Sequence, residues 1–461
     1  MTNPLPPAAM VAHASVRNSA LPIRGIGVPG ALATNVLNMI GIGPFITIPL
    51  ALAAMGGPQA MLGWLLGALL CACDGLVWAE LGSALPHSGG PYHYLREAFG
   101  AQRLGRLFGF IFLWQSLLIG PLSIASGAVG FAQYTRYLAP SLGQSSLTAI
   151  AAAVCLINTG LLWRDVHSIG KVSILVSIVV VTATIWIAVS GAFHFQARLA
   201  FDFPAGAFTL TPAFWTGLGA STLIAVYDYG GYNNVCLIGD EVRDPSRTIP
   251  IAVLVSIALV AALYFGLNLA ILGTVPWREA QHSSAVVADF MQRIYGSAGG
   301  VAVTILILIA SWGSALTVLL GYSRIPYAAA AAGQFFRPFA RLHSTGGFPI
   351  LGLTYMGLLS ALACFFSLGD LIAVLILVQM MFQFLAQCVA VALLRRRQAG
   401  TGRFQMPLYP FPVLITAIGW IYIVVTSQAR HVGIAAAMLV AGAAIYLVEA
   451  RRRSEWPFQA A

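Results

Sequence analysis

The chain has 461 residues, of which 59% are hydrophobic and only 8% carry a charged side chain. A soluble domain carries charges on about a quarter of its residues, so this composition excludes a soluble globular protein. A membrane-spanning helix needs roughly 20 mostly apolar residues, and the chain is long enough for twelve of them with short loops. The net charge of +10 comes from short basic runs between apolar segments, without a nucleic-acid-binding module. We therefore interpret it as a signal of membrane topology.

Apolar runs divided by glycine, proline and arginine predict an all-α integral membrane protein with twelve transmembrane helices. The preceding residues 1–25 lack the features of a cleaved signal and are expected to form a disordered cytoplasmic tail. With the N-terminus inside, eighteen arginines fall in cytoplasmic loops and five outside, which agrees with the positive-inside rule. Both termini are therefore expected in the cytoplasm, and the protein in the inner (plasma) membrane. The expected spans are 26–53, 60–84, 104–135, 146–163, 169–191, 212–238, 249–275, 298–331, 348–367, 369–394, 408–428 and 431–450.

Two of these spans carry interruptions. The first contains Ile40-Gly41-Ile42-Gly43-Pro44, and the sixth contains Tyr227-Asp228-Tyr229-Gly230-Gly231. Glycine has little helix preference, and proline cannot donate to the preceding turn but suits the start of a new helix. Interrupted segments at matching positions in two halves of a chain indicate the central site of a transporter. Glycines that serve only close helix packing are the alternative.

The two interruptions offer opposite partial charges to a ligand. A half-helix that begins after Gly41 presents the free N–H groups of Ile42 and Gly43, which favour a carboxylate. The half-helix that ends near Tyr227 to Tyr229 presents free carbonyl groups, which suit an ammonium group. An α-amino acid carries both groups on one carbon, so the pattern predicts an amino-acid site.

Three further segments resemble the amino acid–polyamine–organocation superfamily. They are the stretch from Gly63-Trp64 through Ala79–Ser83 to Pro86–Tyr92, the stretch Gly239–Pro250, and Ser323–Ala328. The resemblance implies a secondary amino-acid permease that works by alternating access, without enzyme activity, cofactor or bound metal. Its expected partners are an amino acid or amine substrate, the lipid bilayer and protons.

The resemblance also implies a domain organisation. Two inverted five-helix repeats of the LeuT type are expected at residues 26–191 and 212–395, joined by an extracellular linker at 192–211. Two further helices and a cytoplasmic C-terminal tail are expected at 396–461.

Carried over to this chain, the resemblance places the substrate carboxylate at the first interruption and the amino group at the second, with Tyr227 as an aromatic gate. Lys171, the only lysine, matches a residue that replaces sodium in some family members, and Ser314 matches a hydroxyl near that lysine. The expected substrate-binding residues are Ile40, Gly41, Ile42, Gly43, Tyr227, Asp228, Tyr229 and Gly230. The expected coupling residues are Lys171, Ser314 and Asp228.

Charged residues within the expected spans should face the protein interior, because each costs roughly 2.5–3.5 kcal/mol at the bilayer centre. Lys171 is interpreted as a substitute for sodium that makes transport sodium-independent. The alternative is that this lysine is present only by chance in a chain that otherwise uses arginine. Asp228 is expected either to meet a positive charge on the substrate or to carry a coupled proton. A structural acid that accepts hydrogen bonds from unwound backbone is the alternative.

Two other acids receive structural interpretations. Asp74 is expected to be buried and hydrogen-bonded, without a role in the substrate site. Glu80, about one turn from the cytoplasmic end of its helix, is expected to form a structural or gating pair with Arg243 or Arg247.

The predicted function is secondary transport of amino acids, coupled to protons or to exchange, with uptake of polyamines or cationic amino acids as the alternative. A membrane hydrolase would need a nucleophile and a base within hydrogen-bond reach, and the sequence has no such motif. A channel is not favoured either, because no filter-like repeat is visible.

Overall fold

The protein is described by a computed structural model that covers residues 25–164, 169–331, 333–343, 348–397 and 404–458, without the side chains at 164–175 and 177. All named elements in these ranges are helical, and only isolated β-bridges join extended residues. The elements are α1 (Val28–Met39), α2 (Gly43–Met55), η1 (Pro58–Ala60), α3 (Met61–Ala84), α4 (Pro91–Ala98), α5 (Leu104–Leu138), α6 (Gln144–Arg164), α7 (Ile169–His194), α8 (Ala197–Ala200), α9 (Pro212–Tyr229), α10 (Asn234–Leu237), η2 (Gly239–Glu241), α11 (Pro245–Leu272), α12 (Trp277–Ala280), α13 (Val286–Ala331), η3 (Arg337–Ala340), α14 (Ile350–Ala363), α15 (Leu368–Val378), the π-helical turn η4 (Gln379–Phe384), α16 (Leu385–Arg397), α17 (Phe411–Thr426) and α18 (Ala429–Arg452).

Within the described residues, seven helices are long and apolar enough to cross a membrane, and the bent pair of α1 and α2 makes up to eight. The described part of α7, from Ile178, is apolar but shorter, as are α14 and α17. The all-helical membrane class predicted from composition is confirmed. The total of twelve crossings stays a prediction.

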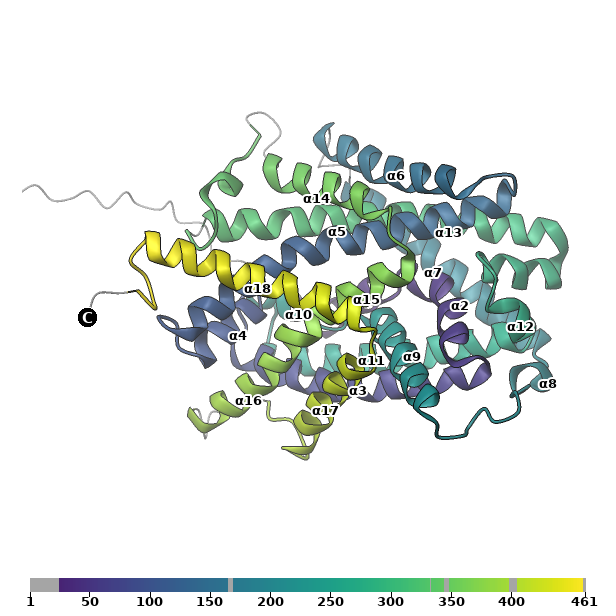
Figure 1. Ribbon diagram of the computed structural model, residues 1–461, viewed down its shortest axis with the longest axis horizontal. Helices are drawn as coiled ribbons and strands as arrows, with labels where there is room; N and C mark the ends of the chain where they lie inside the picture. The colour runs from purple at the N-terminus through teal and green to yellow at the C-terminus, as the bar shows by residue number, and fades with distance from the viewer. Residues whose placement is uncertain (1–24, 165–168, 332, 344–347, 398–403, 459–461) are drawn as a thin grey trace, which may run out of the picture.

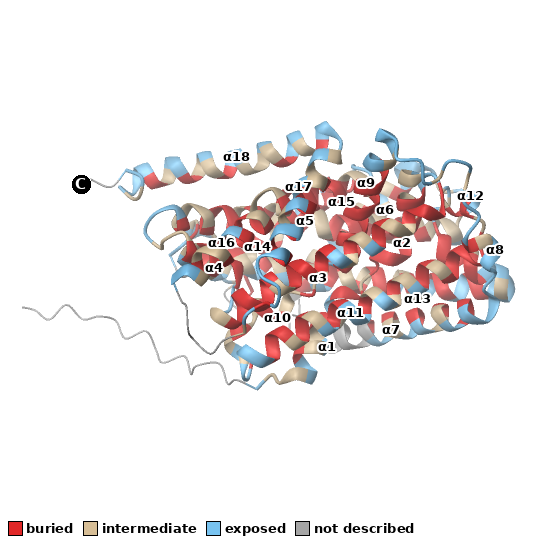
Figure 2. Cartoon of the chain, turned by 90° about the horizontal axis from the view of Figure 1, so that it is seen from below, coloured by how far each residue is buried: buried red, intermediate tan, exposed pale blue. Residues whose placement is uncertain are grey.

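The helices form two packed groups (Figure 1). In one group, α3 packs against α9 and α11, while α1 contacts α11 and α2 contacts α9. In the other, α5 runs along α13 and packs with α6 and α14. Two clusters of buried apolar side chains form the core, and the cluster of the first group also includes residues of α13 and α5. Figure 2 shows α18 on the outside of the bundle, with a largely exposed outer face.

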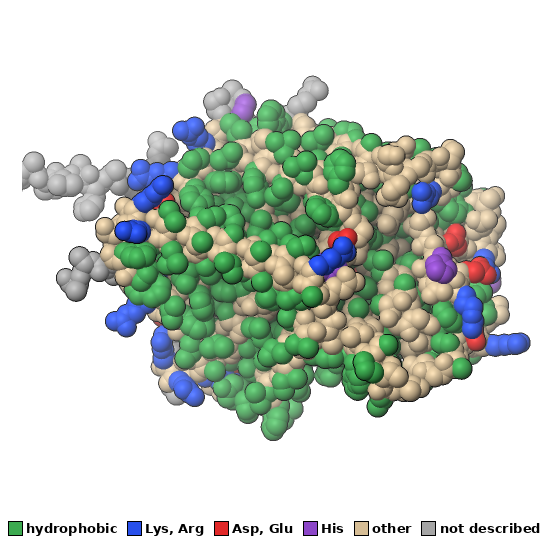
Figure 3. All heavy atoms as spheres, viewed as in Figure 1, with side chains coloured by type: hydrophobic (Ala, Val, Ile, Leu, Met, Phe, Trp, Pro, Cys, Tyr) green, Lys and Arg blue, Asp and Glu red, His purple; other side chains and the backbone are tan. Residues whose placement is uncertain are grey.

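Apolar side chains cover most of the face drawn in Figure 3, and charged side chains gather mainly toward its two ends. A protein in water would place polar side chains over such a surface, whereas a lipid-facing surface must be apolar because lipid offers no hydrogen-bond partners. The distribution agrees with a bundle that crosses a bilayer.

One helix begins earlier than expected. The apolar run predicts a span from residue 298, but α13 starts at Val286 and is interrupted at Gly296, where φ is 71°. Residues before this glycine include Asp289 and Arg293, which an apolar pattern does not recognise as helix.

Candidate functional site

The first break separates α1 from α2, whose axes differ by 50°. α1 ends at Met39 and α2 begins at Gly43, with Pro44 in its first turn. The first N–H groups of a helix have no carbonyl one turn earlier to bond. Ile42 is the N-cap residue of α2, and its apolar side chain accepts no hydrogen bond from the N–H groups at the start of this helix. The N–H groups of Ile42 and Gly43 can therefore hold an anion at the positive end of α2.

The second break follows α9, which ends at Tyr229. Gly230 leaves the helix with φ −53° and ψ 141°, and Gly231 has φ +113°. A positive φ of this size favours glycine strongly, since other residues clash with their own backbone there. The short helix α10 resumes at Asn234, so both interruptions predicted from the sequence are breaks in the structure.

The two breaks touch at the backbone. A Cβ atom placed on Gly231 would lie 3.0 Å from the carbonyl carbon of Asn38 and 3.1 Å from the nitrogen of Met39. Only a residue without a side chain fits this contact without displacement of its neighbours. The unwound segments are thus brought together by the same glycine that makes the second turn possible.

Asn35 of α1 fixes the residues that follow the second break. Its Nδ2 donates to the carbonyl of Tyr232 at 2.5 Å, and its Oδ1 accepts from the N–H of Val235 at 2.9 Å. One buried amide therefore replaces two of the hydrogen bonds that a continuous helix would supply. Tyr264 of α11 does the same at the first break, since its hydroxyl donates to the carbonyl of Met39 at 2.7 Å.

The backbone at both breaks is accessible. Gly230 is exposed and Gly41 is half-buried, although the adjacent Ile42 and Tyr229 are only 4% and 1% exposed. Solvent therefore reaches Gly41 and Gly230, whereas Ile42 and Gly43, whose N–H groups begin the second half of the first span, are buried.

Tyr227 joins the two helix groups. Its hydroxyl lies 2.9 Å from Oγ of Ser126 on α5, and its ring comes within 3.4 Å of the position of a Cβ on Gly43. The aromatic side chain expected to act as a gate thus lies beside the first break. Tyr229 points elsewhere, because its buried hydroxyl donates to the carbonyl of Trp64 at 3.2 Å, so only its backbone faces the second break.

Asp228 connects the second break to the first. Its side chain is 2% exposed, and Oδ2 accepts from the hydroxyl of Thr47 on α2 at 2.7 Å. A Cβ on Gly43 would lie 2.6 Å from Oδ1, and this oxygen has no hydrogen-bond partner among the described residues. The carboxylate is thus bonded by a side chain of α2 and also interacts with the indole of Trp64, rather than with the unwound backbone considered in the sequence.

The two coupling residues are only partly described. Lys171 belongs to α7, but its side chain lies outside the described residues. Ser314 of α13 is half-buried, and its Oγ lies 3.9 Å from the position of a Cβ on Gly41. The expected hydroxyl is therefore next to the first break.

Glu80 does not pair with Arg243 or Arg247 as expected. It forms a two-pronged ion pair with Arg395 of α16, with Nη2 to Oε2 at 2.5 Å, and its Oε2 also accepts from the N–H of Met406 at 2.8 Å. This arrangement satisfies both carboxylate oxygens of a side chain that is 9% exposed. Glu80 thus joins the end of α3 to the chain that follows α16.

The loop after the second break is held by Asp240. Its Oδ2 accepts from the N–H of Ser88 at 2.8 Å, and its Oδ1 lies 3.4 Å from Nδ1 of His87. Burial alone would raise the pKa of this carboxyl, but the hydrogen bonds from Ser88 and His87 outweigh it and the pKa is lowered.

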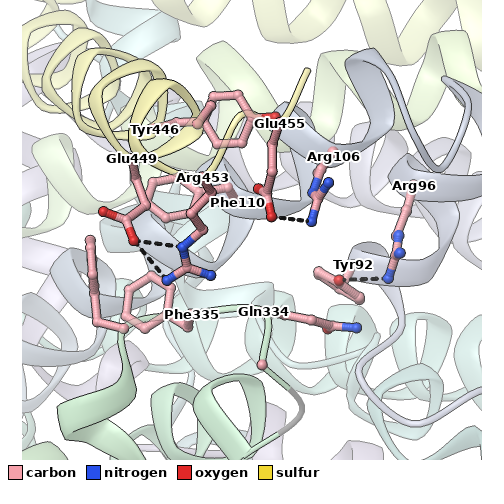
Figure 4. Close-up of a pocket in the computed structure, with 13 residues that line it drawn as sticks. Tyr92, Arg96, Arg106, Phe110, Gln334, Phe335, Tyr446, Glu449, Arg453 and Glu455 are labelled. Carbon is pink, nitrogen blue, oxygen red and sulfur yellow. Dashed lines mark hydrogen bonds and ion pairs between the residues drawn. The ribbon is translucent and has the colours of Figure 1, made fainter. Parts of the chain in front are cut away.

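A separate pocket with a cavity of about 70 Å³ lies among α4, α5, α18 and the segment after α13. Figure 4 shows two ion pairs in its lining, Arg106 with Glu455 and Arg453 with Glu449, each at 2.7 Å, and Arg96 bonded to the hydroxyl of Tyr92. Its lining contains no residue of either break. We therefore place the candidate substrate site at the breaks and regard this pocket as a charged junction between the C-terminal segment and α5.

A sequence profile described as amino acid permease matches residues 27–448. The chain belongs to the amino acid permease family. The permease is 25% identical over 453 residues to the serine/threonine exchanger SteT of Bacillus subtilis (strain 168). The alignment covers 93% of the permease and 97% of SteT.

Two mammalian relatives match over a shorter range. The permease is 28% identical over 345 residues to the large neutral amino acids transporter small subunit 2 of Oryctolagus cuniculus. It is 26% identical over 370 residues to the cationic amino acid transporter 4 of Homo sapiens. These alignments cover 72% and 73% of the permease, but only 62% and 55% of the two relatives.

Several contact residues were not identified from the sequence. Asn35, Thr47, Ser126 and Tyr264 each hold one of the breaks or a side chain beside it. Their common signal is a hydrogen-bonding side chain within an apolar span, which must find a partner inside the protein. That signal does not name the partner, which depends on how the helices pack.

Proposed function

We propose that this permease is a secondary transporter that moves amino acids across the membrane by alternating access. The observation that carries the proposal is the contact of two broken helices, made through Gly231 against Asn38 and Met39. Peptide groups at such breaks can bind charged groups without placing a charged side chain in the bilayer. The two group types present here, free N–H and free carbonyl, match the two ends of an α-amino acid.

In the proposed complex, the α-carboxylate lies at the N–H groups of Ile42 and Gly43, beside the backbone of Ile40 and Gly41. The α-amino group lies at the carbonyl groups of residues 227–230. Tyr227 covers the bound substrate, and its hydrogen bond to Ser126 joins α9 of one helix group to α5 of the other. Breakage of that bond is the proposed gating step.

The proposed architecture has twelve crossings, with inverted five-helix repeats at 26–191 and 212–395. The protein is proposed to lie in the inner (plasma) membrane, with both termini in the cytoplasm. Two observations support it. Helix occupies each expected span, and the breaks occur in the first helix of each proposed repeat. The arginine distribution supports the orientation.

We propose that transport is independent of sodium and coupled to protons or to exchange. Lys171 would supply the positive charge that sodium supplies in other transporters, with Ser314 as a neighbouring hydroxyl. An ammonium group can also release its proton, which a guanidinium cannot do in a protein. Uptake into proteoliposomes should survive replacement of sodium by choline, and loss of uptake in choline would exclude this arrangement.

A cationic amino acid or polyamine is the second candidate substrate. The specific observation in its favour is Oδ1 of Asp228, which is buried and has no hydrogen-bond partner among the described residues. A positive charge on the substrate would supply that partner. The relative named as a cationic amino acid transporter also supports this candidate.

One experiment tests transport and ranks the substrates. Proteoliposomes that contain the purified permease are loaded with unlabelled serine, leucine, arginine or putrescine. Entry of the same compound in labelled form is then measured. We expect counterflow with a neutral amino acid. Counterflow with arginine or putrescine alone would select the second candidate, and no counterflow with any of these compounds would contradict the proposed function.

A further inference from the structure

Asp74 is a second buried acid, outside the proposed substrate site. It lies midway along α3 and is 0% exposed. Its Oδ2 accepts from the hydroxyl of Tyr232 at 2.5 Å, while Oδ1 has no hydrogen-bond partner among the described residues. A fully buried carboxylate with one hydrogen bond is costly if it is charged, because its solvation by water is lost.

Other unpaired polar atoms belong to helices around this acid. The indole nitrogens of Trp78 and Trp420 interact with the carboxylate of Asp74, although their geometry meets no hydrogen-bond criterion in the described chain. Both amide atoms of Gln387 and the hydroxyl of Thr416 also lack partners there. Buried polar atoms are nearly always paired, and internal water commonly completes such groups.

The charged form of Asp74 has donors but no cation to stabilise it. The titratable groups that act on it are the phenol of Tyr232 and nearby thiols, and none of the described groups is a lysine or arginine. The thiols are those of Cys71 and Cys73 on α3, Cys236 on α10 and Cys388 on α16. Burial favours the neutral acid and the hydrogen bond from Tyr232 favours the carboxylate, so these effects oppose each other.

Tyr232 connects this acid to the second break. Its hydroxyl donates to Asp74, while its own carbonyl accepts from Asn35 of α1. The residue is 3% exposed and lies immediately after Gly231. A proton gained or lost at Asp74 therefore changes a hydrogen bond to the unwound segment that contacts the first break.

We propose that Asp74 is a proton-binding site that couples proton movement to the conformation of the second break. This inference rests on the proposed transport function and assigns the proton to an acid outside the substrate site. Protonation weakens the attraction between Asp74 and the Tyr232 hydroxyl, and deprotonation restores it. Substrate binding at the breaks and proton binding at Asp74 are thus coupled through the same segment, each changing the affinity for the other by the same factor.

The experiment compares two activities of each variant in proteoliposomes. Counterflow without a pH gradient measures substrate exchange, and accumulation driven by an inward proton gradient measures coupling. For Asp74→Asn we expect counterflow within about two-fold of the wild type, with accumulation reduced to the level seen without a gradient. Asp228→Asn should instead change the substrate concentration that gives half-maximal counterflow.

Tyr232→Phe provides a second variant that keeps the acid and the aromatic ring. Loss of the donor favours the protonated acid, so the midpoint of the pH profile of accumulation should move up by about one to two pH units. Tyr134→Phe is the control, because it removes a buried hydroxyl that donates to the carbonyl of Phe45 and is not among the groups that act on Asp74, and its profile should match the wild type.

The outcomes separate the two proposals. If the wild type shows no counterflow, the transport function itself is wrong. If it shows counterflow but Asp74→Asn accumulates substrate as the wild type does, or Tyr232→Phe leaves the pH midpoint unchanged, the role of Asp74 is overturned. Counterflow without any response of the wild type to a proton gradient would also overturn it.

Discussion

Substitution of Gly231 by alanine tests the contact between the two breaks. The new Cβ would lie 3.0 Å from the carbonyl carbon of Asn38, at a residue whose φ is +113°. An unfavourable φ costs about 1–3 kcal/mol, and overpacking adds about 1–3 kcal/mol. We therefore expect Gly231→Ala to lose about 2–6 kcal/mol of stability and most of its transport.

Two other glycines separate these causes. Gly56 has φ +68° with nothing within 4 Å of a Cβ, so Gly56→Ala should lose only the backbone contribution, about 1–2 kcal/mol. Gly266 lies within α11 with open space around it, and Gly266→Ala should gain about 0.5–1 kcal/mol from helix preference. Thermal unfolding in detergent and counterflow in proteoliposomes measure all three variants. Equal stability and transport for the variants at 231 and 56 would refute the proposed contact.

Three further substitutions test individual hydrogen bonds. Glu80→Gln should lose about 3 kcal/mol of stability, because its arginine partner keeps a largely buried charge. Glu449→Gln removes a more exposed ion pair with Arg453 and should lose less than about 1 kcal/mol. Equal shifts in thermal unfolding for the two variants would contradict this order. Thr47→Val should lose about 1–3 kcal/mol of stability and weaken substrate binding, whereas the control Thr222→Val removes only a hydrogen bond within its own helix. If Thr47→Val left both the stability and the substrate concentration for half-maximal counterflow unchanged, the role of the Thr47–Asp228 hydrogen bond would be contradicted. Asp240→Asn should be destabilising at neutral pH, because the pKa of Asp240 is lower in the folded protein than its unfolded value of about 3.9. The stability that the carboxylate contributes is present above about pH 3.9 and is lost as the pH falls through the folded pKa, so a stability difference between variant and wild type that persists at lower pH would contradict this linkage.

The positions of the breaks were predictable because they depend on short-range chemistry. Gly41, Gly43 and Pro44 disfavour a continuous helix by themselves, and the paired glycines at 230 and 231 do the same. Such preferences act within a few residues and can be read in sequence order. Helix ends at Met39 and Tyr229 follow from them.

The partners of the buried acids could not be predicted in this way. Glu80 pairs with Arg395, 315 positions away, although Arg243 and Arg247 were equally plausible from charge alone. Asp228 bonds Thr47 across 181 positions. These contacts depend on the rotation and depth of packed helices, which a single sequence does not specify. Local pattern located the two breaks, and tertiary packing determined which side chains contact them.

The central claim is that peptide groups at two breaks hold both ends of an α-amino acid. The direct measurement is competition for counterflow by L-serine and L-leucine, by their methyl esters, which lack the carboxylate, and by glycerate and 2-hydroxyisocaproate, which lack the amino group. The account predicts that at least one of the two amino acids competes, while its ester and its hydroxy acid are each at least ten-fold weaker. Competition by an ester or a hydroxy acid as strong as by the amino acid would contradict it.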